Sequence, residues 1–154
     1  MLALLVSGAC SRGPDRPRSV VIVSLDTVRA DRLGCHGRDG AGTPRLDALA
    51  ARGARFERAM TPTPLTLPAH ASLLTSRLPL RHGVRHNEIH ALPEAATTLA
   101  EALRGAGLRT GSFVGTAVLP PKHGLGQGFD AHTGVEPAQG EAFVMAERSA
   151  ADVN

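Results

Sequence analysis

Aromatic residues are scarce in this chain of 154 amino acids, which contains four Phe and neither Trp nor Tyr. Proteins that bind single-stranded nucleic acid stack successive bases on aromatic side chains, so a nucleic-acid partner is not expected. Two cysteines are too few for the disulfide framework of a small secreted domain. After the N-terminal residues, no stretch is long and apolar enough to span a membrane.

The rest of the composition is typical of a folded domain. Hydrophobic residues make up 42% and charged residues 20% of the chain, and a chain of this length can bury a real core. The net charge of +3 comes from arginines scattered along the sequence. This positive balance suits a small anionic substrate, but only weakly.

Residues 1–18 are predicted to be a signal-like segment and linker, ahead of a domain at 19–154. The apolar run Leu4–Cys10 is followed by the polar Ser11–Asp15, which is similar to the end of a bacterial lipoprotein signal. Cys10 is therefore a candidate lipidation site. This pattern predicts a protein of the bacterial cell envelope or periplasm that is attached to the membrane through a lipid on Cys10. A frayed apolar terminus is the alternative, because the run is short and no basic residue precedes it.

The predicted order of elements indicates an α/β fold, with a mostly parallel sheet flanked by helices. Residues 19–25 form a continuous, largely β-branched run, which predicts a buried strand of a parallel sheet. Further strands are expected at 54–60 and 109–114.

Three helices are expected, from Thr43-Pro44 to Gly53, over 67–75, and from Thr98 to Gly107. The first has a Thr that can cap it and a Pro at its first position. The third opens on a capping box, Thr98-Leu-Ala-Glu101. Ser149-Ala-Ala-Asp152 repeats the capping-box pattern with only two residues after it, so the chain is expected to be truncated there.

Two oxygen-bearing side chains stand at the ends of predicted elements. Asp26 follows the predicted strand 19–25, and ligands bind beyond the carboxyl ends of strands in open α/β sheets. Its carboxylate could ligate a divalent cation. Thr66 stands where a helix begins, among backbone N–H groups that stabilise anions. The structural alternatives are a turn Asp and a simple Thr N-cap.

Histidines offer weaker signals. His70 lies one helical turn after Thr66 and could hydrogen-bond an anionic substrate or its leaving group; a partly exposed helical His is the alternative. His82, His86 and His90 are spaced for one face of a helix and could bind zinc. Histidines scattered in a loop are favoured there, because the intervening residues suit a helix poorly.

Several ordered motifs resemble the sulfatases of the alkaline phosphatase superfamily. TLPAHASLLTS at 66–76 is similar to the family signature Cys-x-Pro-x-Arg-Ala-Ser-Leu-Leu-Thr-Gly, and RLPLRHGV follows it as Arg-x-Pro-x-Arg-His-Gly-Val does in the family. TPRLDALA at 43–50 resembles Thr-Pro-Asn-Leu-Asp-Arg-Leu-Ala. GLRT at 107–110 and GFD at 128–130 match two further family segments. The resemblance implies an alkaline phosphatase-like fold, incomplete in this chain.

Departures from the family pattern change the chemistry that the resemblance implies. Thr66 stands where sulfatases carry a Cys that becomes formylglycine, so that route is closed. A Thr nucleophile resembles the nucleophiles of the phosphodiesterase and phosphotransferase branches of the superfamily. His70 replaces the Arg that supports the modified residue. Thr27 follows Asp26 where typical sulfatases have two adjacent Asp ligands, and Gly115-Thr-Ala-Val118 lacks the family's Lys and His.

The resemblance implies the N-terminal portion of a metal-dependent hydrolase of sulfate or phosphate esters. Asp26 and Thr66 would bind a divalent cation, with Ca²⁺, Mn²⁺ and Zn²⁺ all open. Thr66 and His70 would be catalytic. Asn87 and Thr116 would line the pocket for a small anionic ester.

The family's later Asp-His or Asp-Asn metal pair falls beyond this sequence, so residues 1–154 are expected to be inactive alone. The alternatives are a phosphodiesterase or phosphotransferase of the same superfamily and a catalytically silent envelope binding protein.

Overall fold

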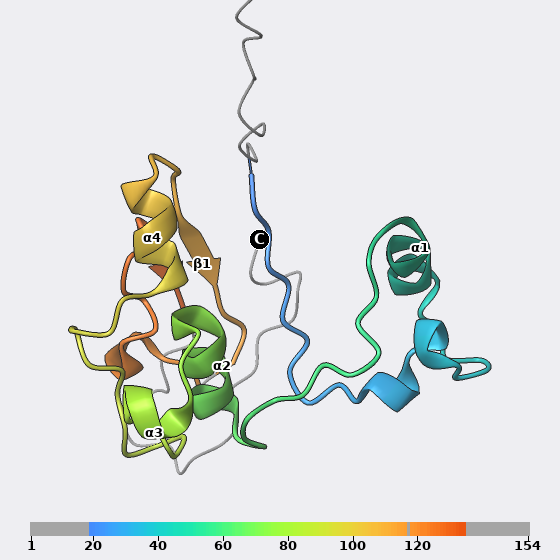
Figure 1. The fold of residues 1–154 in the computed structure, drawn as a ribbon, viewed down its shortest axis with the longest axis horizontal. Coiled ribbons are helices and arrows are strands. Elements are labelled where there is room, and N and C mark those ends of the chain that lie inside the picture. Colours follow the sequence, from blue (N-terminus) through green and yellow to red (C-terminus); the bar gives the residue numbers. More distant parts are fainter. Residues whose placement is uncertain (1–18, 117, 135–154) are drawn as a thin grey trace, which may run out of the picture.

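The computed structural model describes residues 19–116 and 118–134. In chain order its elements are the 3-10 helices η1 (Ala30–Arg32) and η2 (Gly34–His36), the helices α1 (Pro44–Arg52), α2 (Thr66–Thr75), α3 (Pro79–His82) and α4 (Leu99–Gly105), strand β1 (Gly111–Phe113), the 3-10 helix η3 (Pro121–His123) and strand β2 (Ala131–Thr133). Figure 1 shows a body that holds α2 to α4 and β1, and a lobe around α1 joined to it by extended chain.

The core of the body forms around α2, which packs against α3 and α4. Leu67 and Ala71 lie one turn apart on α2 and are fully buried, so one face of this helix is fixed in the core. Loop residues complete the cluster, which consists of Leu67, Ala71, Val84, Leu92, Ala96, Leu119 and Leu125. The N-terminal turn of α2, where Thr66 lies, is thereby held on a packed helix.

A buried histidine joins α3 to α2. His82 is only 2% exposed; its Nδ1 accepts the Val84 amide proton at 3.1 Å, and its Nε2 lies 2.9 Å from Ser72 Oγ. Ser72 donates in turn to the Pro68 carbonyl at 2.9 Å. Since the Val84 amide only donates, Nδ1 carries no proton. The expectation of a loop histidine is wrong for His82, which is the last residue of α3 and whose ring satisfies two buried polar groups.

The two strands pair in parallel, with Gly111 opposite Ala131. The residues just before them fix this register. The Thr110 amide donates to Asp130 Oδ2 at 2.8 Å, and the Asp130 amide donates to Thr110 Oγ at 3.0 Å. The bond from the Thr110 N–H to the carboxylate, with a smaller contribution from the Thr110 side chain, holds the pKa of Asp130 below its usual value. The GLRT and GFD segments are therefore bonded partners.

The three predicted helices are confirmed. α4 has both halves of its capping box, with the Thr98 amide donating to Glu101 at 2.8 Å and the Glu101 amide donating to Thr98 Oγ at 3.2 Å. α1 begins at Pro44 as expected, but Thr43 makes no side-chain cap. Its hydroxyl is occupied elsewhere, since it accepts the Gly34 amide proton at 3.0 Å and lies 3.2 Å from an Asp47 oxygen.

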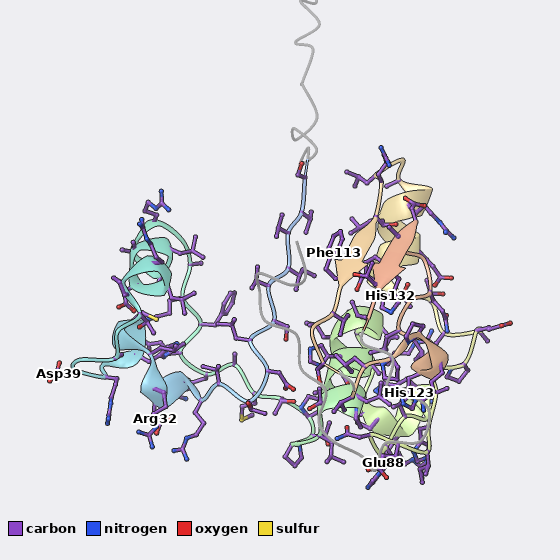
Figure 2. The ribbon with its side chains drawn as sticks, turned by 180° about the vertical axis from the view of Figure 1, so that it is seen from behind. Arg32, Asp39, Glu88, Phe113, His123 and His132 are labelled. Atoms are coloured by element: carbon purple, nitrogen blue, oxygen red, sulfur yellow. The ribbon has the colours of Figure 1, made fainter. Side chains whose placement is uncertain are left out.

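The lobe around α1 is held together by these same side chains. Asp47 Oδ1 accepts the Cys35 amide proton at 2.6 Å, close to the bond between Gly34 and Thr43. A Cβ at Gly34 would collide with Asp47. Thr43 and Asp47 of the TPRLDALA segment therefore bind the backbone of residues 34–35 and hold it against α1. Figure 2 shows Arg32 and Asp39 in this lobe, away from His123 in the body.

The predicted strand at 19–25 is not formed. The segment is not in a helix, lies beside the body in Figure 1, and makes no sheet pairing with any part of the described ranges. Val21 is 83% and Val23 75% exposed. A β-branched run favours an extended backbone, but a strand also needs a neighbour to satisfy its N–H and C=O groups. Here β1 and β2 pair with each other, so the prediction that 19–25 shares their sheet is wrong.

Residues 54–60 also form no strand. Arg55 donates to Glu57 at 3.0 Å and to the Cys35 carbonyl, and Met60 is 92% exposed. Local polar contacts hold this stretch as an open turn, without a packed face that would favour a strand.

Candidate functional site

Alternation along the extended segment determines which of its side chains reach α2. Ser24 and Asp26 are two residues apart, so their side chains point to the same side. Thr66 and His70 lie one turn apart on α2. The structure joins these four side chains in two pairs, Asp26 with Thr66 and Ser24 with His70. The candidate site is this contact between the extended segment and the first two turns of α2.

The Thr66 hydroxyl donates to the Asp26 carboxylate. Its Oγ lies 3.1 Å from Asp26 Oδ2 and 3.4 Å from Oδ1. A cation bound by both side chains requires their oxygens to lie within about 5 Å of each other, and these distances meet that requirement, although Asp26 does not follow a strand of a sheet. Asp26 Oδ1 also accepts the Thr27 amide proton at 3.0 Å. Thr27 has a φ of 56°, a left-handed conformation that is costly for a β-branched residue.

A distant side chain caps the start of α2. Leu65, at the N-cap position, has no side-chain acceptor to offer. Asn87 Oδ1 instead accepts the Leu67 amide proton at 3.0 Å, and the next residue, Pro68, has no amide proton. Asn87 therefore lies beside Thr66. Its predicted part in an anion pocket stays a prediction, and the structure adds a capping contact.

Both ring nitrogens of His70 are engaged. Nδ1 lies 2.8 Å from the Thr66 carbonyl oxygen, within the same helix. Nε2 lies 2.9 Å from Ser24 Oγ. The imidazole of His70 therefore links the backbone of Thr66, the candidate nucleophile, to Ser24 in the extended segment. Its predicted catalytic role stays a prediction.

One open space of about 1580 Å³ reaches all the predicted site residues of the described ranges. Its walls include Asp26, Thr66, His70, Asn87 and Thr116. Thr116 reaches it from the loop after β1, where its Oγ accepts the Val118 amide proton at 3.3 Å. Cys10, the predicted lipidation site, lies outside the described residues.

A divalent cation would find part of its ligand set here. The carboxylate of Asp26 and the hydroxyl of Thr66 are oxygen donors that suit a hard cation. Within 19–116 and 118–134, no group of three or more His, Cys, Asp and Glu side chains gathers to hold a metal. Since Ca²⁺ takes about six to eight oxygens, the pair fits a cation but does not complete its shell.

Ser24 is a site residue that the sequence motifs did not predict. Its signal is positional, since it lies two residues before Asp26 in a segment predicted to be extended. That spacing places a hydroxyl on the same side as the carboxylate. The partner, His70, could not be read from spacing alone, because the two residues are 46 positions apart.

Comparisons with known proteins agree in pointing to one family. The family model described as Sulfatase matches residues 18–144. Human arylsulfatase A is 36% identical over 136 residues, which cover 80% of this chain and 27% of that protein. N-acetylgalactosamine-6-sulfatase from Mus musculus is 33% identical over 145 residues, covering 84% and 28%.

Among solved structures, the phosphonate monoester hydrolase of Agrobacterium radiobacter is similar, with a TM-score of 0.61 and 28% identity over 73% of this chain and 25% of that one. The chain therefore spans about a quarter of the length of these proteins.

Proposed function

This chain belongs to the sulfatase family, and from that premise we propose that it carries the nucleophile of a metal-dependent hydrolase of sulfate or phosphate esters. The contact between the Asp26 carboxylate and the Thr66 hydroxyl carries the proposal. It brings a candidate metal ligand and a candidate nucleophile together at the N-terminus of a packed helix. There the backbone N–H groups favour the anionic group of a small ester substrate.

Asp26 and Thr66 would hold the cation, with further ligands from outside the described residues. When bound, the cation would ease loss of the Thr66 proton and stabilise charge on the ester oxygens. An oxygen-only donor pair favours Ca²⁺ or Mn²⁺ over Zn²⁺.

Thr66 Oγ would attack the sulfur or phosphorus of the ester. A bond from Oγ to that atom forms as the bond to the leaving alcohol oxygen breaks, and water later releases the group from Thr66. Asn87 and Thr116 would line the anion pocket, and His70 would support the reacting residue. In the described part of the chain, Asn87 already contacts the first turn of α2.

A second candidate function, phosphodiesterase or phosphotransferase activity, is favoured by Thr66 itself. A plain hydroxyl stands where sulfatases carry their modifiable Cys, so the site would use an ordinary covalent ester. The likeness to a phosphonate monoester hydrolase supports this branch. A catalytically silent envelope binding protein is the alternative from another class.

Paramagnetic broadening by Mn²⁺ in NMR spectra of the 154-residue protein tests the metal site. We expect Mn²⁺ to broaden amide resonances around Asp26 and Thr66, because even a partial oxygen site concentrates the cation there. Asp26→Asn removes the charge at nearly constant shape and should abolish this broadening. Asp39→Asn, an exposed carboxylate in the distant lobe (Figure 2), is the matched control. Unchanged broadening in Asp26→Asn would reject the site.

We further propose attachment to the bacterial envelope through acylation of Cys10. None of the helices in the described ranges is long and apolar enough to span a membrane. The lipoprotein-like pattern before Cys10 is what supports the proposal. Mass spectrometry of the protein from its host should show a lipid mass that Cys10→Ser removes and Cys35→Ser retains. An unmodified Cys10 would contradict it.

A further inference from the structure

Two separate side-chain contacts join the extended segment to α2. Asp26 and Ser24, two residues apart, meet Thr66 and His70, which lie four residues apart. The order is reversed along the two elements, so the segment runs antiparallel to α2. Among the described residues, these are the side-chain hydrogen bonds that tie the segment to the helix.

The contact with Ser24 has a defined direction. The Thr66 carbonyl oxygen can only accept, so the proton of this bond belongs to His70 Nδ1. In the neutral ring, Nε2 then carries a lone pair and accepts the Ser24 hydroxyl proton. The hydrogen bond from His70 Nδ1 to the Thr66 carbonyl thus leaves Nε2 as the acceptor that faces Ser24.

The segment depends on such anchors. Residues 20–25 have no sheet partner in the described ranges, and their large apolar side chains are at least 49% exposed. A shift by one residue would turn Val23 and Leu25 toward α2 in place of Ser24 and Asp26. Among the polar groups of the segment, the Ser24 hydroxyl and the Asp26 carboxylate meet α2 in the observed register.

We propose that Ser24 is a positioning residue: it acts through His70 to fix the register of the extended segment on α2, and so places Asp26 on Thr66. The catalytic consequence rests on the proposed function of Asp26 and Thr66. The contact itself is independent of that function and is tested without activity.

Nitrogen NMR of His70 in the 154-residue protein tests the contact. We expect the wild type to show the Nδ1–H tautomer with a hydrogen-bonded Nε2. Ser24→Ala should shift the Nε2 resonance and the amide resonances of Asp26 and Thr27, and Ser24→Thr, which keeps the hydroxyl, should restore them. Ser19→Ala, at an exposed serine of the same segment, is the control. A wild-type Nε2–H tautomer, or a Ser24→Ala spectrum equal to that of the wild type, would overturn the proposal.

Mn²⁺ broadening adds a functional measurement on the same variants. Ser24→Ala should raise the Mn²⁺ concentration for half-maximal broadening about tenfold, as loss of a supporting contact does, and Ser24→Thr should return it to the wild-type value. An unchanged concentration in Ser24→Ala would overturn the positioning role. If the wild type shows no broadening at all, the proposed function fails, and the His70 spectra still decide the role of Ser24.

Discussion

His82 is kept neutral by its surroundings. Its Nδ1 already accepts the Val84 amide proton, so a second proton there would displace a buried hydrogen bond. Burial between α2 and α3 holds the pKa of His82 below its usual value of 6.5. The unfolded chain, in contrast, binds this proton freely as the pH falls below about 6.5.

We therefore expect the free energy of unfolding to be highest above about pH 6.5 and to fall as the pH drops below it, because the unfolded state then binds more protons. Urea titrations at several pH values measure this slope. His82→Gln should reduce the slope and lower stability by about 1–3 kcal/mol, since buried partners lose their bonds. His86→Gln, at an exposed histidine, should leave the slope unchanged. An equal slope in wild type and His82→Gln would contradict this account.

Individual residues differed in how far the sequence could assign them. The start of a helix at Thr66 was predictable from the local sequence, whereas the strand expected before Asp26 is not formed, so the contact of Asp26 with Thr66 does not rest on that predicted element. The contact of Ser24 with His70 was not predictable, since it depends on which ring nitrogen α2 turns outward. The capping of Leu67 by Asn87 joins a loop to a helix across twenty positions, and no local pattern carries that information.

At the scale of elements, the turn before β2 passes very close to α4. Gly128 has a φ of 84°, and a Cβ there would collide with the backbone of Glu101 in the first turn of α4. The Thr98 hydroxyl, at the N-cap of the same helix, donates to the Gln127 carbonyl at 2.9 Å. The GFD motif thus begins with a glycine because the chain must touch a capped helix there.

We expect Gly128→Ala to lower the free energy of unfolding by about 2–5 kcal/mol, from left-handed strain and the clash with α4 together. Gly105→Ala is the matched control. Gly105 lies in α4 with open space around it, and alanine there should raise stability by about 0.5–1 kcal/mol. Urea denaturation of both variants measures the difference. A Gly128→Ala protein as stable as the wild type would show that the turn can move away from α4.

Helices were predictable in this chain and strands were less so, for a physical reason. The capping box of α4 and the Pro that begins α1 act within one turn, so their signals are complete in the sequence. A strand depends on a neighbour that the local sequence does not contain. Residues 19–25 have the right composition but no partner in the described ranges, whereas β1 and β2 are aligned by Thr110 and Asp130.

For the whole molecule, family membership confirms the resemblance and the α/β fold class that the motifs predicted. The activity of residues 1–154 is a separate question. The described residues bring together Asp26 and Thr66, but among them no group of three or more His, Cys, Asp and Glu side chains gathers to hold a metal. We expect this chain alone to hydrolyse neither aryl phosphate nor aryl sulfate measurably. Robust metal-dependent turnover by residues 1–154 would contradict that.

Substrate preference in a longer chain should follow the charge of the transferred group. A phosphoryl group carries more negative charge than a sulfuryl group, so it gains more from a cation and from the N-terminus of α2. Thr66 also lacks the formylglycine chemistry of sulfatases. We expect a higher kcat/KM for an aryl phosphate than for the matched aryl sulfate. A clear sulfate preference would show that the replacement of Cys by Thr does not set specificity.

The role of Thr66 is tested most directly by kcat/KM for aryl phosphate hydrolysis in a longer chain that includes the later metal pair of the family. Thr66→Ala removes the attacking oxygen while keeping α2, and should lower kcat/KM by roughly 10³-fold or more. Thr97→Ala, at an exposed threonine outside the site, should keep the wild-type value. A Thr66→Ala enzyme that retains wild-type kcat/KM would contradict the account.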